Sequence, residues 1–300
     1  MRTLLLVLTI GLFGFANLSA VAARQATPTS SPTAGESYAH PEMLADAQWL
    51  QTQRGESTVK VVALTSADDF AAGHVPGAAQ IDWGDLDLVE TSDQAVATWR
   101  EEIEQKLTAL GLTMSDTVII YDGGTFYAAR LWWILHQLGH QDVRILNGGY
   151  PAWVIANGEV ETGPSTVSPA AQPYIGTPNE SSIATLSEVE AALDNPAVSL
   201  VDARAPNEYA AGHIPGAVNI EFTQNGEPDL PHYWKSAADL LTMYEAVGVT
   251  PDRTVIPYCV SGVRSSAAYF TLRLLGFENI SLFTGSWREW SSHPELPVER

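Results

Sequence analysis

The residues with the clearest chemical potential are Cys259 and Arg264, which bound the segment Cys-Val-Ser-Gly-Val-Arg. Cys259 is the only cysteine of the chain and follows an apolar run, Val255–Tyr258, that is predicted to be a strand. A helix is predicted over Ser265–Leu275, ended by Gly276. The loop between them must therefore cross a helix N-terminus, where unpaired amides and the helix dipole attract anions. The same field favours a thiolate over a thiol and makes the cysteine a better nucleophile.

The spacing within this segment fits an anion-binding loop. Gly262 lets the backbone turn its amides inward without a side chain in the way. Four residues separate Cys259 from Arg264, and a thiolate beside a guanidinium fork suits a small tetrahedral oxyanion that carries a leaving sulfur. From the cysteine count alone, the thiol is either buried and inert or works as a nucleophile. The loop favours the nucleophile.

The chain contains the same pattern twice. The stretch Asp-Phe-Ala-Ala-Gly-His-Val-Pro-Gly-Ala at 69–78 returns as Glu-Tyr-Ala-Ala-Gly-His-Ile-Pro-Gly-Ala at 208–217, and the block at 117–122 returns at 254–259. This period of 137 to 139 residues is far longer than that of solenoid repeats. We therefore expect two whole domains, each with its own core.

Each unit alternates predicted strands and helices. Val198–Val201 and Thr254–Pro257 are short apolar runs typical of buried parallel strands, and Leu186–Leu193 is a helix stopped by Asp-Asn-Pro. This alternation predicts the α/β class, with a parallel sheet flanked by helices in each domain. His74 and His213 lie in the repeated turn, and we expect both to stabilise it by hydrogen bonding.

Length and charge limit the classes of function. Three hundred residues that are 45% apolar can build two ordinary domains. The formal net charge of −20 argues against nucleic acid as a partner and against anionic membrane surfaces. An anionic substrate therefore needs a pocket whose own arginines and amides overcome the acidic background.

The N-terminus is typical of an export signal. Residues 1–23 begin with Met1-Arg2, continue with an apolar run and end near the small residues Ala20-Val21-Ala22, as signal peptides do. The apolar run is shorter than the ~20 residues of a spanning helix, although an uncleaved anchor is the alternative. Residues 24–37 are rich in Ser, Thr and Pro and predict a flexible linker. We expect an exported protein, secreted, periplasmic or at the cell surface, without stable membrane insertion after cleavage.

Three motifs together carry a family resemblance: the repeated Gly-His-(Val/Ile)-Pro-Gly-Ala stretch, the loop CVSGVRSS, and the closing Gly-Ser-Trp-Arg-Glu-Trp at 285–290. With them the chain resembles a tandem-domain rhodanese, a thiosulfate sulfurtransferase, over about residues 40 to 298. The resemblance implies the rhodanese α/β fold in both halves. It implies a non-catalytic rhodanese domain at 38–165 and a catalytic one at 180–300.

The resemblance also implies the site residues. Cys259 is the sulfur-accepting nucleophile, Arg204 is a substrate-binding arginine, and Asp202 helps to hold the site together. The backbone amides that cradle the anion belong to Val260, Ser261, Gly262, Val263 and Arg264. No metal and no organic cofactor is required. Alternative interpretations pair Arg204 with Glu208 or Asp202, and Arg264 with a backbone carbonyl.

The two halves are not equivalent. Asp122 occupies the cysteine position in the first unit, and a carboxylate cannot accept sulfane sulfur and repels an anionic substrate. Ala63 and Thr65 stand where the second unit has Asp202 and Arg204. The first half is therefore predicted to be non-catalytic, with an interface that helps to wall the active site.

The predicted reaction moves sulfane sulfur from thiosulfate to cyanide or a small thiol through a Cys259 persulfide. Ser261 leaves 3-mercaptopyruvate open as the donor, because a hydroxyl at this position also occurs in mercaptopyruvate sulfurtransferases, whereas Arg264 favours thiosulfate. Two more functions stay open: a cysteine-dependent phosphatase, which uses one more residue between cysteine and arginine, and a non-enzymatic persulfide carrier. The partners of the sulfurtransferase are a small-molecule sulfur donor and acceptor, while the physiological acceptor and the oligomeric state stay open.

Overall fold

The computed structural model describes residues 37–300. The signal peptide predicted at 1–23 lies outside the described residues, and so does the linker predicted at 24–37 except for its last residue. Within 37–300, no helix combines the length and the apolar character that a membrane crossing requires.

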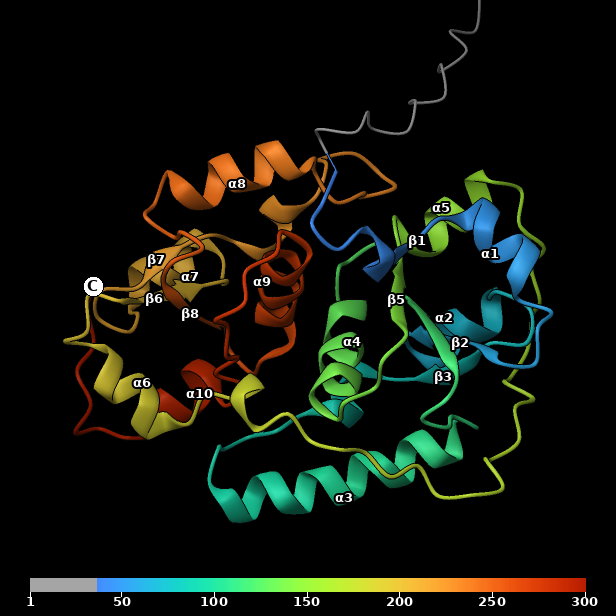
Figure 1. Cartoon of the computed structure of the whole chain (residues 1–300), viewed down its shortest axis with the longest axis horizontal. Coiled ribbons are helices and arrows are strands. Elements are labelled where there is room, and N and C mark those ends of the chain that lie inside the picture. The colour runs from blue at the N-terminus through green and yellow to red at the C-terminus, as the bar shows by residue number, and fades with distance from the viewer. Residues whose placement is uncertain (1–36) are drawn as a thin grey trace, which may run out of the picture.

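The first half of the chain is built on a five-stranded sheet in the order β1-β5-β4-β2-β3 (Figure 1). Every strand pair in it is parallel. Its helices and strands are β1 Leu44–Ala45, α1 Ala47–Gln53, β2 Val59–Leu64, α2 Ala67–Ala72, β3 Ala79–Ile81, α3 Asp93–Ala109, β4 Thr117–Tyr121, α4 Ala128–Gln137, β5 Val143–Leu146 and α5 Gly149–Ile155.

The second half is built on a three-stranded parallel sheet in the order β7-β6-β8. Parallel bridges Val255–Ile280 and Ile183–Leu282 continue beside it. Its helices and strands are α6 Leu186–Ala192, β6 Val198–Asp202, α7 Pro206–Ala211, β7 Val218–Asn219, α8 Ala237–Glu245, β8 Thr254–Tyr258, α9 Val263–Leu274 and α10 Ser286–Ser291. The predicted fold class, two α/β domains with parallel sheets, is confirmed.

Strand β4 shows why both faces of the first sheet are covered. Val118 and Ile120 pack in the apolar cluster that contains residues of α3 and α4, whereas Ile119 and Tyr121 pack with residues of α1, α2 and α5. A continuous apolar run is what a parallel strand buried on both faces requires. The carboxyl end of β4 therefore lies inside the domain, where Asp122 follows it.

The predicted elements agree with the observed ones to within two residues. The helix expected at Leu186–Leu193 is α6, whose Thr185 and Glu188 form a reciprocal capping box. The helix expected at Ser265–Leu275 is α9, which begins at Val263 and ends before Gly276, a residue with φ of 88°. The earlier start matters because it puts Arg264 on the first turn of the helix.

The two domains pack through α4 and α9, which lie side by side between the two sheets (Figure 1). The ring of Trp132 meets that of Phe270 edge-on at 4.9 Å, and the ring of Phe126 meets that of Trp234 edge-on at 4.7 Å. One apolar cluster contains buried residues of both halves. The domain junction is therefore a core in its own right, and it brings the first half close to the loop after β8.

The repeated turn is stabilised in the same way in both domains. The Nδ1 atom of His74 lies 2.8 Å from the carbonyl oxygen of Phe70, and the two rings stack. His213 and Tyr209 repeat this arrangement at 3.0 Å. The expected structural role of the two histidines is confirmed. The domain limits 38–165 and 180–300 stay predictions, with α5 ending at 155 and α6 beginning at 186.

Candidate active site

Cys259 is the first residue after β8, and the loop 259–262 joins it to α9. Its thiol is free and only 1% exposed, so the cysteine lies at the bottom of the loop and not at its surface. Gly262 forms the N-cap of α9 with φ of 85°, in the left-handed region that glycine adopts without strain. A β-carbon at this position would also meet Thr284 Oγ1 at 2.7 Å, so the loop requires glycine here.

The loop turns its carbonyls away and leaves its amides free. The carbonyl of Cys259 accepts from the Trp287 amide at 3.0 Å, and the carbonyl of Val260 accepts from the Arg288 amide at 3.1 Å. Within residues 37–300, the amides of Val260, Ser261 and Gly262 find no acceptor. The amides of Val263 and Arg264 belong to the first turn of α9, where a backbone amide has no acceptor within the helix. The five predicted amides thus lie together at the positive end of a helix, the arrangement of an anion cradle.

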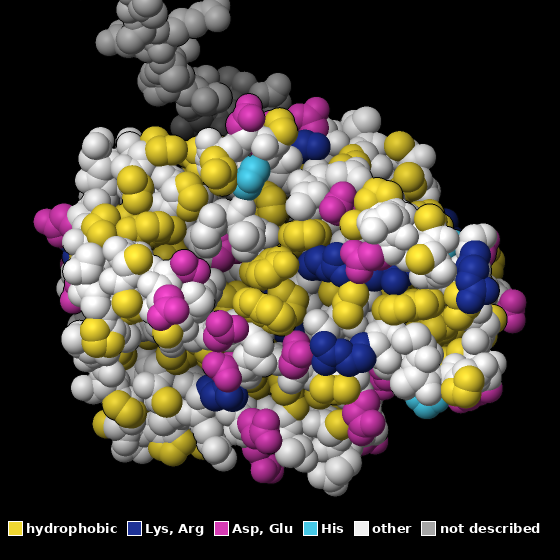
Figure 2. Space-filling view, turned by 180° about the vertical axis from the view of Figure 1, so that it is seen from behind, with side chains coloured by type: hydrophobic (Ala, Val, Ile, Leu, Met, Phe, Trp, Pro, Cys, Tyr) yellow, Lys and Arg dark blue, Asp and Glu magenta, His cyan; other side chains and the backbone are white. Residues whose placement is uncertain are grey.

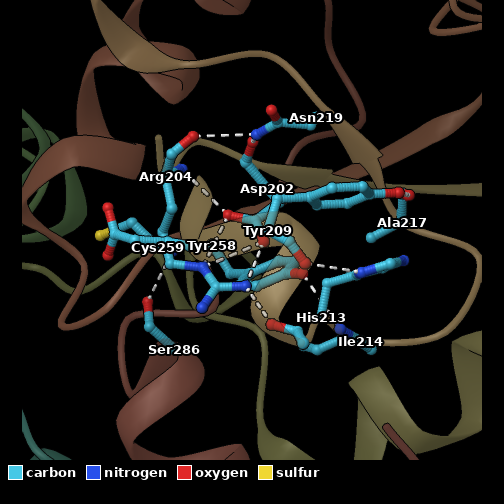
Figure 3. A network of polar contacts seen from close by, with 12 residues as sticks. Asp202, Arg204, Tyr209, His213, Ile214, Ala217, Asn219, Tyr258, Cys259 and Ser286 are labelled. Carbon is cyan, nitrogen blue, oxygen red and sulfur yellow. Dashed lines mark hydrogen bonds and ion pairs between the residues drawn. The ribbon is translucent and has the colours of Figure 1, made fainter. Parts of the chain in front are cut away.

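Ser286 holds the cysteine end of this loop. Its Oγ accepts the Cys259 amide at 3.1 Å and donates to the Phe283 carbonyl at 2.8 Å (Figure 3). The residue has φ of 58°, an uncommon conformation for a non-glycine residue that persists only where surrounding contacts impose it. Sequence reasoning did not assign Ser286 a role, although it lies in the Gly-Ser-Trp-Arg-Glu-Trp motif. It directs the Cys259 amide away from the cradle.

Arg264 is held by a carboxylate and not by a backbone carbonyl. Its Nη1 and Nη2 donate to Glu208 at 2.6 and 2.9 Å. These hydrogen bonds raise the pKa of Arg264 above its ordinary range, and they lower the pKa of Glu208. Of the two partners considered for Arg204, Glu208 instead pairs with Arg264, and Asp202 is the partner of Arg204. The guanidinium is still at the cradle, but its charge is compensated.

Asp202 and Arg204 form a buried ion pair beside the loop. Nε of Arg204 lies 3.0 Å from both carboxylate oxygens of Asp202, and Nη2 lies 2.5 Å from Oδ2 and 2.8 Å from the Gly212 carbonyl (Figure 3). The side chains are 0% and 3% exposed. Burial lowers the pKa of Arg204, but the hydrogen bonds to Asp202 outweigh it and the pKa is raised overall. The pairing with Asp202 is the arrangement observed, and a direct contact of Arg204 with substrate stays a prediction.

In the corresponding loop of the first domain, the side chain of Asp122 occupies the amide cradle. Asp122 Oδ1 accepts from the amides of Gly124 at 2.7 Å and Thr125 at 3.0 Å, and Oδ2 accepts from the amide of Ala128 at 2.8 Å. The carboxylate thus occupies the place that an anion would take in the Cys259 loop. A cavity of about 450 Å³ lies beside it, lined among others by Thr65 and Tyr150.

The first domain also contributes side chains around the Cys259 loop. Tyr127 packs its ring near those of Trp83 and Phe222, with centroids 6.2 and 5.9 Å apart, and its hydroxyl is one of the groups that raise the pKa of Arg264. Arg130, fully buried, donates from Nη1 to Thr284 Oγ1 at 2.9 Å. Sequence reasoning missed Arg130, although a charged residue inside the apolar run of α4 was a visible signal.

Figure 2 shows acidic side chains spread over one face, with Lys and Arg side chains grouped beside a central apolar patch. No three His, Cys, Asp or Glu side chains gather as a metal site within residues 37–300. The donor set around Cys259 consists of amides and guanidinium groups, which suit an anion and not a metal ion.

The family model described as a rhodanese-like domain matches the chain twice, at residues 46–156 and 185–293. The chain belongs to the rhodanese-like family. Each matched range contains the corresponding strand-loop-helix unit, β4-Asp122-α4 in the first and β8-Cys259-α9 in the second. The Asp122 loop and the Cys259 loop therefore occupy corresponding positions in the two rhodanese-like domains.

Curated relatives of this rhodanese-like chain support a sulfurtransferase. It is 32% identical to the thiosulfate sulfurtransferase of Pseudomonas aeruginosa, over 83% of this chain and 94% of the relative. The thiosulfate sulfurtransferase of Corynebacterium glutamicum is also 32% identical, over 91% and 96% of the two chains. A Thermus thermophilus protein named sulfur carrier protein TtuD is 31% identical, over 88% and 98%.

Solved structures extend the rhodanese-type comparison. YnjE superimposes with a TM-score of 0.73 at 28% identity, over 88% of this chain and 70% of that one. The anaerobic ergothioneine biosynthesis enzyme from Chlorobium limicola, solved with trimethyl histidine, has a TM-score of 0.78 at 25% identity, over 87% and 71%. The two-domain fold therefore also occurs in a protein named for chemistry other than thiosulfate sulfur transfer.

Proposed function

We propose that the protein is a thiosulfate sulfurtransferase that carries sulfane sulfur as a persulfide on Cys259. The observation that carries this proposal is the contrast between the two loops. Asp122 fills its own amide cradle, whereas the Cys259 loop presents free amides, a neighbouring guanidinium and a nucleophilic residue type. The relatives named thiosulfate sulfurtransferase support the same donor.

In the first half-reaction, the Cys259 thiolate attacks the outer sulfur of thiosulfate. The sulfur–sulfur bond of thiosulfate breaks, its electron pair leaves with sulfite, and Cys259 keeps the transferred sulfur as a persulfide. The sulfonate oxygens lie over the amides of Val260 to Arg264, which stabilise the charge as sulfite departs. Arg264 adds to this field, reduced by its pairing with Glu208.

In the second half-reaction, cyanide or a small thiol attacks the outer sulfur of the persulfide. The new carbon–sulfur or sulfur–sulfur bond forms as the Cys259–sulfur bond breaks, and the thiolate returns. Because Cys259 is only 1% exposed, the acceptor must be small or must enter along the domain junction. A protein acceptor that needs a surface persulfide is disfavoured.

Steady-state kinetics test this function. With thiosulfate and cyanide both varied, we expect parallel double-reciprocal plots, the pattern of a ping-pong enzyme, and thiocyanate as product. Cys259→Ser is expected to lose this activity, with Ser281→Ala, a partly exposed serine whose hydroxyl bonds to the Ser181 carbonyl, as the matched control. Undiminished thiocyanate formation by Cys259→Ser contradicts the proposal.

One observation favours 3-mercaptopyruvate as a second candidate donor. The charge of Arg264 is compensated by Glu208, so the positive charge that pointed to the dianion thiosulfate is weaker than the sequence alone indicates. Ser261 adds a hydroxyl in the cradle, 8% exposed. A ratio of kcat/KM for thiosulfate to that for 3-mercaptopyruvate above one supports the first donor, and a ratio below one the second.

Two further hypotheses, a persulfide carrier and a phosphatase, predict different assay results. The relative named sulfur carrier protein keeps open a protein that is loaded with sulfur but does not turn over. Persulfide formation without turnover by cyanide or any small thiol favours the carrier, and hydrolysis of an aryl phosphate favours the phosphatase. Export is a further part of the proposal, and a mature N-terminus near Ala22, sequenced from protein made in cells, is its test.

A further inference from the structure

Arg130 lies at the domain junction, carried by α4 of the first domain and facing the second. Its side chain is 0% exposed. Nη1 donates to Thr284 Oγ1 at 2.9 Å and Nη2 donates to the Leu86 carbonyl at 2.8 Å. Its guanidinium carbon lies 4.9 Å from the ring centre of Trp133. One guanidinium therefore joins two segments of the first domain to one segment of the second.

This guanidinium lies directly against the catalytic loop. A β-carbon placed on Gly262 would come within 2.9 Å of Nη1 of Arg130 and within 2.7 Å of Thr284 Oγ1. Thr284 is two residues before Ser286, which accepts the Cys259 amide. Arg130 thus contacts Thr284, which lies against the loop at Gly262. Thr284 is in turn close to Ser286, which holds the loop at Cys259.

The charge of Arg130 has no carboxylate partner among residues 37–300. No carboxylate of these residues lies within ion-pair distance, and its Nε is buried without an acceptor. Asp87, whose charge acts on Arg130, pairs with Arg288. Burial lowers the pKa of Arg130 to about 10, while the charges of Asp87 and Cys259 act to raise it. The guanidinium is still protonated at neutral pH. A buried cation without a counter-ion is costly unless an anion arrives to compensate it.

We propose that Arg130 is a positioning residue by which the non-catalytic domain fixes the Cys259 loop and places a buried positive charge behind its anion cradle. The anions that use this charge are the Cys259 thiolate and the sulfonate of the donor. In a site shielded from water such a charge acts more strongly than an exposed one. The planar fork is needed because it bonds Thr284 and Leu86 at the same time, which an ammonium group on a flexible stem does not do.

The expected change in kcat/KM rests on the proposed function, but the expected change in the alkylation of Cys259 does not. Alkylation of Cys259 by iodoacetamide reports the thiolate without any sulfur donor. If the wild-type protein is alkylated but forms no persulfide from thiosulfate, the proposed function fails while the role of Arg130 is still measured. The two failures are therefore distinguishable.

The test compares Arg130→Met, Arg130→Lys and the control Tyr38→Phe in the full chain. Tyr38→Phe removes a hydrogen bond of 2.6 Å from the N-terminal segment to the Lys235 carbonyl, a long-range contact that does not involve the loop. We expect Arg130→Met to slow alkylation at pH 7 about tenfold, with recovery at alkaline pH, because the thiolate loses a stabilising charge. Tyr38→Phe is expected to react like the wild type.

Arg130→Lys separates charge from geometry and serves if Arg130→Met does not fold. We expect its alkylation rate at pH 7 to stay within about threefold of wild type, because the charge is kept. We expect kcat/KM for the sulfur donor to fall about tenfold, because a lysine does not bond Thr284 and Leu86 at the same time. Arg130→Met with a wild-type pH profile of alkylation overturns the electrostatic role. Arg130→Lys with wild-type kcat/KM overturns the positioning role.

Discussion

The guanidinium of Arg264 and the carboxylate of Glu208 form a two-point ion pair, with N–O distances of 2.6 and 2.9 Å. Arg264 lies on the first turn of α9 and Glu208 on α7, so the pair links the catalytic loop to the helix after β6. It lies at the partly exposed rim of the site. Glu208 therefore decides how much of the Arg264 charge a substrate anion meets.

Replacing Glu208 by glutamine is expected to lower the KM for thiosulfate several-fold, because Arg264 then offers its full charge to the anion. kcat is expected to change less than KM. Glu188→Gln, an exposed carboxylate in the capping box of α6, is the matched control. Steady-state kinetics on both variants check the prediction, and a raised KM in Glu208→Gln would mean that the pair orients Arg264 rather than restrains it.

Removing one partner of the Asp202–Arg204 pair is expected to destabilise the protein more than removing both, because the remaining charge is buried without its partner. Asp202→Asn leaves a buried guanidinium without its carboxylate and should lower the free energy of unfolding by about 3 to 5 kcal/mol. Arg204→Met alone should do the same, while the double variant should lose much less than the sum. Urea unfolding of the four proteins measures this coupling. Additive losses would show that the two charges act independently.

Replacing Asp122 by alanine is expected to empty the amide cradle of the first domain. The amides of Gly124, Thr125 and Ala128 lose their acceptor, which should cost about 1 to 3 kcal/mol. Because the emptied cradle resembles an anion site, sulfate should raise the melting temperature of this variant more than that of the wild type. The exposed Asp194→Ala is the control. An equal response to sulfate in all three proteins contradicts a self-filled cradle.

Buried His136 is expected to make the free energy of unfolding depend on pH. Burial, and then the charge of Arg273, lower the pKa of His136 to about 4. The unfolded chain therefore binds a proton between about pH 6.5 and 4 that the folded protein does not, so stability is lost as the pH falls through this window. His136→Phe, which keeps a ring to stack on Trp132, should remove on the order of 2 kcal/mol of this loss. Unfolding curves at about pH 7 and pH 4.5 check it, and an unchanged difference refutes it.

Much of the fold was readable because it depends on local pattern. The parallel strands are apolar runs, the helices have caps and glycine stops, and the duplicated stretch shows that each half is a domain. The cradle was predictable for the same reason, since a strand, a glycine-containing loop and a helix follow one another along the chain around Cys259. The start of α9 was placed two residues late because Gly262 was assigned only to the loop, whereas it is the N-cap of the helix.

The partners of Arg264 and Arg130 were not readable, because they come from distant parts of the chain. Arg264 meets Glu208 across 56 residues and Arg130 meets Thr284 across 154. A single sequence gives the charge of each residue but not its register against another element. The burial of the Cys259 thiol was left open for the same reason, since nothing local indicates that it is only 1% exposed.

Cys259 is proposed to carry the transferred sulfur. Intact-mass and peptide mass spectrometry of the protein after treatment with thiosulfate, and again after cyanide, measure this sulfur directly. We expect a gain of one sulfur, ~32 Da, located on Cys259, absent from Cys259→Ser and removed by cyanide. Turnover of thiosulfate while Cys259 gains no mass would show that the sulfur is not carried on this residue.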